Sequence, residues 1–369
     1  MVSATGVDSS TDPEPPGSPR AAVSGPRRLR AKVAQFWLGI LISLACVVAV
    51  LRVVDLEQVR RSLAGNDWRL AVAVITVSQL VFVVLRARRW QLMLAAAVQR
   101  EGGAVASVPY GPLFHAQNIG YLITALLPFR LGDLARSYLA GKFPGLTLLA
   151  ALSSVFMERI LDVLMIVLFL GLAIPFVPSL PTSMTVAGVA FAGAAVIGVM
   201  SMVLAAANRR WLLERLLIWP KRLGTAPRAR WLAWLENLLD GLNILTDRRL
   251  LAPVALLTVL LWSAIVAAYY WGLTACWPSV TLPAALITVC AAAFGISAPS
   301  SPGSVGVFHA AVVLGLSVFA ISPEDALSFA VVYHAVMYLT NLILGLVGLW
   351  RSGYSLGGVM AAVRESSGA

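Results

Sequence analysis

The sequence predicts an all-α integral membrane protein with about six full transmembrane helices and two broken, re-entrant helical hairpins. Of the 369 residues, 59% are hydrophobic and only 12% are charged. Soluble domains carry about 25% charged residues, so this chain lacks the polar side chains needed to cover a surface in water. Long apolar runs recur along the chain, and two of them are interrupted by proline, glycine and charged residues.

Six apolar runs are long enough to cross a bilayer, which takes about 20 residues of helix. They are residues 36–54, 68–86, 148–174, 184–206, 251–275 and 327–350. The first run follows a basic cluster, and no small-residue cleavage site comes after it, so we interpret it as a signal anchor rather than a signal peptide. Residues 1–31, which are rich in Pro, Ser, Gly and Ala, are expected to be a disordered tail.

Two further apolar stretches, 106–140 and 281–320, cannot form straight helices. Proline removes a backbone donor and clashes with the preceding turn. Irregular backbone at membrane depth is tolerated only where protein or a water-filled cavity covers it. We therefore predict a broken helical hairpin in each stretch, with breaks at Pro128, Gly132, Pro299, Pro302 and Gly306.

Lysine and arginine residues set the expected orientation, because they accumulate on the cytoplasmic side. The formal net charge of +11 fits this rule and anionic lipid headgroups better than it fits nucleic acid. We expect cytoplasmic positions for the N-terminal tail, for Arg86, Arg88, Arg89 and Arg100 after the second run, and for the amphipathic segment 207–250. The membrane domain is then 32–351, both termini are cytoplasmic, residues 352–369 form a short tail, and one hairpin enters from each side of the cytoplasmic membrane.

A shift of 175 residues relates the two halves of the chain weakly. It places Ala151-Leu152-Ser153 on Ala326-Leu327-Ser328, and Arg159 on His334. Each half is then a broken hairpin followed by a long span. Inverted repeats with discontinuous helices are typical of transporters, whose binding sites lie where the breaks meet.

Charged residues within the membrane require compensation or a purpose, because each costs about 2.5–3.5 kcal/mol at the bilayer centre. Arg130 and Arg136 can hold a lipid phosphate through their guanidinium forks, with Asp133 orienting one of them. The alternative is a cytoplasmic loop that obeys the positive-inside rule. Arg159 and Asp162 lie three residues apart on one helix face and can pair.

Glu158 needs a partner of its own, because Asp162 lies only four residues away on the same face. We expect it to meet another cation, Arg130 or Arg136, or to take up a proton. A purely structural network is the alternative. The remaining members of the polar network are Asn118, His309 and His334.

The second break offers a different anion site. A helix that restarts near Ser304 or Val305 presents free backbone N–H groups at the positive end of its dipole. Ser301, Gly303 and Ser304 are therefore candidates for headgroup binding, although a hairpin turn without a ligand is the alternative. The three histidines are scattered, so we expect no metal, and no cofactor motif is present.

These residues together resemble one known family. Three motifs occur in order: Asn118…Leu127-Pro128-Phe129-Arg130-Leu131-Gly132-Asp133…Arg136, then Glu158-Arg159…Asp162, then Pro299…Ser301-Pro302-Gly303…Gly306-Val307. Their order and spacing are similar to those of the flippase-like family, which is also called the lysylphosphatidylglycerol synthase transmembrane region. The resemblance covers roughly residues 35–350. It implies a lipid translocase whose matching polar residues line the lipid route.

The chain departs from the family pattern at two places in its second half. An acidic residue often follows the second glycine motif, where this sequence has Phe308-His309. Arginine often stands in the last span at the position of His334. The full-length synthases add a soluble transferase domain that we do not expect in this chain, so we do not expect the synthase activity of it.

We therefore expect a lipid flippase or transporter that moves a phosphate-bearing glycolipid or aminoacyl lipid across the cytoplasmic membrane. One alternative is an integral membrane enzyme or enzyme subunit acting on a lipid-linked substrate; no catalytic motif supports it. A second is a non-catalytic scaffold for a lipid synthase. The expected partners are membrane lipids, and a separate lipid-modifying synthase or glycosyltransferase is a further candidate partner, whereas nucleic acid is not expected.

Overall fold

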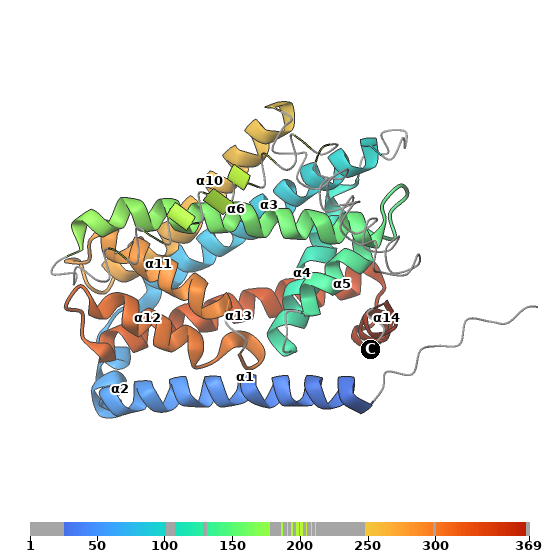
Figure 1. The fold of residues 1–369 in the computed structure, drawn as a ribbon. Helices are drawn as coiled ribbons and strands as arrows, with labels where there is room; N and C mark the ends of the chain where they lie inside the picture. Colours follow the sequence, from blue (N-terminus) through green and yellow to red (C-terminus); the bar gives the residue numbers. More distant parts are fainter. Residues whose placement is uncertain are drawn as a thin grey trace, which may run out of the picture.

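The computed structural model describes residues 26–100, 108–127, 131–177, 248–297 and 300–366, with isolated positions between 186 and 211. The described segments are helices joined by short turns and contain no strand, which confirms the all-α class (Figure 1). Because so much of the chain is apolar helix, the backbone polar groups are satisfied within each helix, as a bilayer requires.

Four described helices are long and apolar enough to cross a membrane, and they make the chain a multi-pass membrane protein. They are α3 (Trp68–Arg100), α6 (Leu148–Ala173, extended by the 3₁₀ turn η1, Ile174–Phe176), α10 (Arg248–Thr274) and α13 (Pro323–Ser352). Helices α1 (Pro26–Val53) and α2 (Leu56–Gly65) are bent by 83° and together provide a candidate fifth span. Most of the predicted run 184–206 lies outside the described residues.

Helices extend into both segments that the sequence assigned to tails. Helix α1 begins at Pro26, so the end of the tail expected to be disordered is helical; proline suits a first helical turn, where its missing N–H has no partner to lose. The predicted C-terminal tail contains α14 (Leu356–Ser366), which packs against α5 through the buried side chains Val359 and Val363. Most of the amphipathic segment 207–250 lies outside the described residues, and α10 includes its last three positions.

Helix starts are encoded locally by capping side chains. Thr147 Oγ1 accepts the Ala150 N–H at 3.1 Å at the start of α6, and Ser322 Oγ accepts the Asp325 N–H at 3.1 Å at the start of α13. These bonds satisfy backbone donors that the first turn leaves unpaired. Helix α2 docks on the same end of α13, where Ser62 Oγ donates to Asp325 Oδ1 at 2.7 Å.

Both predicted broken hairpins are present. The first consists of α4 (Tyr110–Leu126) and α5 (Leu131–Ala140), and the second of α11 (Leu282–Ser297) and α12 (Val307–Ser317), joined through the 3₁₀ turn η4 (Pro302–Ser304). Pro128 and Pro299 lie outside the described residues. Helix α12 starts later than expected, because Gly303 (φ 69°) and Gly306 (φ 85°) adopt left-handed conformations that end the helical path.

Glycines allow the hairpins to pack closely. In the first hairpin, a Cβ on Gly132 would collide with the Gly120 carbonyl oxygen, so α4 and α5 touch backbone to backbone. In the second, a Cβ on Gly306 would lie 2.6 Å from the carbonyl oxygen of Ser43 in α1. Ser43 Oγ also accepts the Ser301 N–H at 2.8 Å, so α1 is anchored to the second break.

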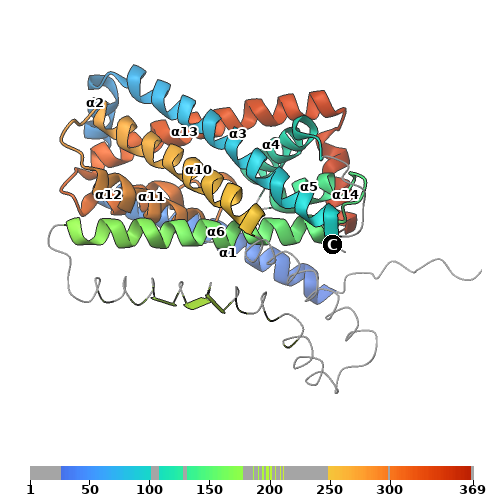
Figure 2. The same ribbon diagram turned by 90° about the horizontal axis from the view of Figure 1, so that it is seen from above.

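The two halves repeat one arrangement of elements. Helix α5 packs on α4 and α6 in the first half, and α12 packs on α11 and α13 in the second. Helix α1 lies along the lower edge of the molecule, beside α12 (Figure 1). Helix α10 runs along α3 (Figure 2).

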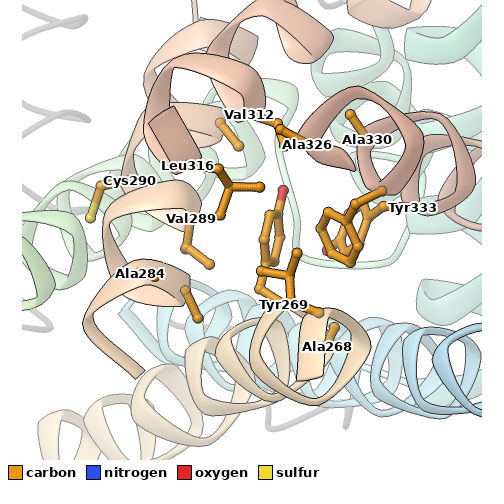
Figure 3. Packing of buried hydrophobic residues seen from close by; sticks show 14 of the residues in the cluster. Ala268, Tyr269, Ala284, Val289, Cys290, Val312, Leu316, Ala326, Ala330 and Tyr333 are labelled. Atoms are coloured by element: carbon orange, nitrogen blue, oxygen red, sulfur yellow. The ribbon is translucent and has the colours of Figure 1, made fainter. Parts of the chain in front are cut away.

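Between α10, α11, α12 and α13 lies a hydrophobic core. Tyr269 of α10 lies next to Tyr333 of α13, with ring centroids 4.4 Å apart, and Val289 and Leu316 close the same space (Figure 3).

Candidate functional site

A network of seven charged side chains lies inside the helical bundle. Its members come from α3, α5 and α6 and are Arg86, Arg89, Asp133, Arg136, Glu158, Arg159 and Asp162. Four arginines face three carboxylates, so the described network carries one excess positive charge when all members are ionised. An uneven network of this kind favours an anion as its missing partner.

Glu158 is the fully buried centre of the network, with no exposed surface. Its Oε2 accepts from Arg136 at 2.6 Å and from Arg86 at 3.2 Å. The prediction that Glu158 meets a second cation is therefore confirmed, with Arg136 in that role. The Arg136 guanidinium also lies 4.7 Å from the ring centroid of Trp90, which adds a cation–π contact.

The Asp162 carboxylate accepts hydrogen bonds from side chains of three helices. Arg89 of α3 lies 3.1 Å away, and the Trp262 indole N–H of α10 donates to the same carboxylate at 3.2 Å. The predicted pairing of Arg159 with Asp162 is present at 3.5 Å. Asp162 therefore links α3, α6 and α10, and Arg89 extends this link to Thr258 of α10 at 3.2 Å.

The structure places Arg86 and Arg89 within a span that the sequence interpretation ended at residue 86, and their cytoplasmic side stays a prediction. Helix α3 continues to Arg100, and the two residues are 6% and 0% exposed within the bundle. The sequence did contain a pattern that could have indicated this burial. Arginines three residues apart share one helix face, as do Arg159 and Asp162, and complementary faces of that kind can pair.

Asp133 connects the first hairpin to α6. Its carboxylate lies 2.9 Å from Arg159 and 3.1 Å from Arg136. The sequence predicted that Asp133 orients one arginine, and in the structure Asp133 contacts two. Arg159 is the more accessible of the two, because its side chain is 36% exposed whereas that of Arg136 is 3% exposed.

A cavity of about 280 Å³ lies next to the network and brings the two broken hairpins together. The first half contributes Arg86, Asp133, Arg136 and Arg159 to its wall, and the second contributes Gly303, Ser304, Phe308 and His334. Tyr338 of α13, also in the wall, donates to the Ala125 carbonyl at the end of α4 at 2.6 Å. The volume of the cavity is near the lower end of the range for small-molecule sites.

Several polar atoms around the cavity are buried without a hydrogen-bond partner among the described residues. They include Arg86 Nε, Arg136 Nη1, Tyr121 Oη and His334 Nε2. Buried polar groups are nearly always paired, so unpaired donors in the wall of a cavity favour a polar ligand there.

The other residues that the sequence predicted for the site differ in whether they reach the cavity. Ser301 does not line the cavity; its hydroxyl donates to the Val305 carbonyl at 3.3 Å. Asn118 is fully buried and donates to the Phe114 carbonyl of its own helix. His309 lies beside His334, with ring centroids 5.0 Å apart. Arg130 lies outside the described residues.

The described residues contain no group of three or more His, Cys, Asp or Glu side chains arranged to hold a metal ion. The arrangement is an arginine-rich, partly apolar cavity between two helix breaks. Such a cavity can bind an anionic group that carries apolar chains.

Comparison with known families agrees with this arrangement. The model of the lysylphosphatidylglycerol synthase TM region matches residues 36–345, most of the chain. The chain belongs to this family. Both broken hairpins and the whole charge network lie within the matched range. The comparisons with curated proteins and with solved structures found no match. Membership in the lysylphosphatidylglycerol synthase TM region family indicates a membrane protein that handles lipids.

Proposed function

We propose that this chain is a lipid flippase that moves a phosphate-bearing glycolipid or aminoacyl lipid across the cytoplasmic membrane. The observation that carries the proposal is the cavity between the two hairpins, with Arg86, Arg136 and Arg159 in its wall. Guanidinium groups match phosphate oxygens in charge and in geometry. The excess positive charge of the network supplies the attraction.

Movement of the headgroup follows from the position of the site. The cavity is formed by helix breaks from two halves that share one order of elements, as in transporters built from repeats. Rocking of one half against the other would expose the arginines to each side in turn. The acyl chains would stay in the bilayer, so only the headgroup needs a polar route.

Arg159 is the residue that we expect to contact the phosphate most directly, because its guanidinium is the most accessible of the described arginines in the network. Its loss also leaves Asp133 paired with Arg136 at 3.1 Å, which limits structural damage.

The test uses proteoliposomes that contain the purified chain, a fluorescent lipid and a membrane-impermeant quencher. The lipid panel holds anionic phospholipids, lipid-linked sugars and aminoacyl lipids. Wild type should make the inner-leaflet lipid accessible, and Arg159→Gln should slow this by about tenfold or more, because a hydrogen bond between charged groups is worth about 1.5–3 kcal/mol. Arg69→Gln is the matched control, because that side chain is 94% exposed and lies away from the cavity.

Two outcomes would contradict the proposal. Equal rates for wild type and Arg159→Gln would show that the cavity is not the lipid route. No movement of any lipid in the panel would exclude a flippase of these lipids and favour an enzyme or a scaffold for a separate synthase or glycosyltransferase.

A further inference from the structure

Two histidines lie together in the second half of the bundle. His309 belongs to α12 and His334 to α13, and their ring centroids are 5.0 Å apart. His309 Nδ1 accepts the Gly306 N–H at 3.4 Å, so in the neutral ring its other nitrogen carries the proton. His334 is 6% exposed and lines the cavity.

The position of His334 corresponds to that of Arg159. The shift of 175 residues that relates the halves places one on the other. In the first half, Arg159 of α6 pairs with Asp133 of α5 at 2.9 Å. In the second half, His334 of α13 lies beside His309 of α12. One wall of the cavity thus carries a permanent cation, and the other carries a group that is cationic only when protonated.

Among the described residues around His334, no carboxylate is ready to pair with it. Asp133 is the only carboxylate among the described residues of the cavity wall, and both Arg136 and Arg159 already contact it. The other titratable or charged groups facing the cavity or this ring come from α3, α4, α10, α12 and α13; they are Arg86, Tyr121, Tyr269, His309, Tyr333 and Tyr338. A protonated His334 would therefore need a counter-charge from a ligand.

Glu158, for which the sequence also allowed the uptake of a proton, is less suited to proton coupling. Its carboxylate contacts Arg136 at 2.6 Å and Arg86 at 3.2 Å, so its counter-charges are already within the protein. His334, in contrast, has a buried Nε2 without a partner among the described residues.

We propose that His334 is a proton-binding site and that its proton moves together with the lipid phosphate, so that the proton gradient drives lipid movement. The inference rests on the proposed function. The imidazole takes one proton from water on one side, and the imidazolium faces the anionic headgroup in the cavity. When the headgroup leaves on the other side, the proton returns to water there. Only an N–H bond forms and breaks in this cycle.

Thermodynamic linkage makes the proposal measurable, because the lipid raises the proton affinity of His334 by the same factor by which the proton raises the lipid affinity. The full-length chain would be labelled at the histidine ring carbons and studied by NMR in nanodiscs of neutral lipid. The chain has 3 histidines, so single His→Gln variants assign every signal. The probe is dihexanoyl phosphatidylglycerol, whose phosphodiester does not titrate in the range used.

Over a titration from about pH 5 to pH 8, we expect the proton affinity of His334 to rise about tenfold when the lipid is added. The lipid should bind about tenfold tighter at the acidic end of that range, and His334→Gln should remove this dependence. His115→Gln is the matched control, because His115 lies in α4 and does not line the cavity. It should keep the dependence of the wild type.

The proposal is overturned if His334 stays neutral throughout, or if the lipid leaves its titration unchanged. The titration uses wild type, so it decides the matter even if His334→Gln does not fold. In vesicles, a pH gradient should drive lipid movement by wild type and by His115→Gln but not by His334→Gln. Movement that depends on Arg159 yet ignores the gradient and His334 would leave the flippase proposal standing and remove this one. A lipid that neither binds nor moves would remove both.

Discussion

Replacing Glu158 with glutamine removes the negative charge at the centre of the network and keeps the shape of the side chain. Breaking a fully buried ion pair costs about 3–5 kcal/mol, because the remaining charge stays buried without compensation. After the substitution, Arg136 still forms an ion pair with Asp133 at 3.1 Å, and Arg86 still forms one with Asp162 at 3.7 Å. Each arginine thus retains one carboxylate, and we expect a loss near the lower limit, about 3 kcal/mol.

The change can be measured by heating the purified protein in detergent with a fluorogenic maleimide. Cys290 is 1% exposed and becomes reactive only when the core opens. Burial raises the pKa of the Cys276 thiol, so its background reaction is slow at neutral pH. For a chain of this size we expect the apparent midpoint of Glu158→Gln to fall by about 5 °C.

Glu57→Gln is the matched control. Glu57 also contacts two arginines, Arg60 at 2.6 Å and Arg61 at 3.4 Å, but the three side chains are about half exposed or more. Exposed ion pairs are worth about 0–1 kcal/mol, so this variant should melt close to wild type. Equal midpoints for Glu158→Gln and Glu57→Gln would refute the reasoning. The double variant Glu158→Gln/Arg136→Gln should lose less than the two single losses together, because it removes both charges of one pair.

Three further predictions use the same melting assay or amide exchange. Gly132→Ala should destabilise strongly, by about 2 kcal/mol or more, because a Cβ there overlaps the α4 backbone, whereas Gly111→Ala meets nothing within 4 Å and should be nearly neutral. Trp262→Phe should cost about 1–3 kcal/mol, because it removes the indole donor from a buried carboxylate; no change in the midpoint would mean that this bond is absent. Ser43→Ala should speed hydrogen exchange at the Ser301 amide by about fivefold or more, because the hydroxyl that accepts this N–H is lost, and unchanged exchange would show that α1 does not hold the second break.

The locally encoded features of this protein were predictable from its sequence. The two broken hairpins follow from proline and glycine chemistry, and the structure places them at 110–140 and 282–317. The N-cap at Ser322 follows from its hydroxyl and the proline after it. The pairing of Arg159 with Asp162 follows from helix periodicity.

The features that depend on distant segments were not predictable in the same way. The sequence did not show that Arg86 and Arg89 lie in the protein interior, because the end of an apolar run does not reveal that the helix continues. Whether the two hairpins meet was also open, and the shared cavity answers it for the described residues.

By itself, the sequence determined that the chain is apolar helix, where the helices break, and which charged residues need compensation in a membrane. These depend on composition and on interactions within a few residues. Only the tertiary structure decided which arginine meets which carboxylate, because Arg86 and Glu158 are 72 positions apart yet lie 3.2 Å from each other. It also placed His334 opposite the arginines, since that relation arises only when the two halves pack together.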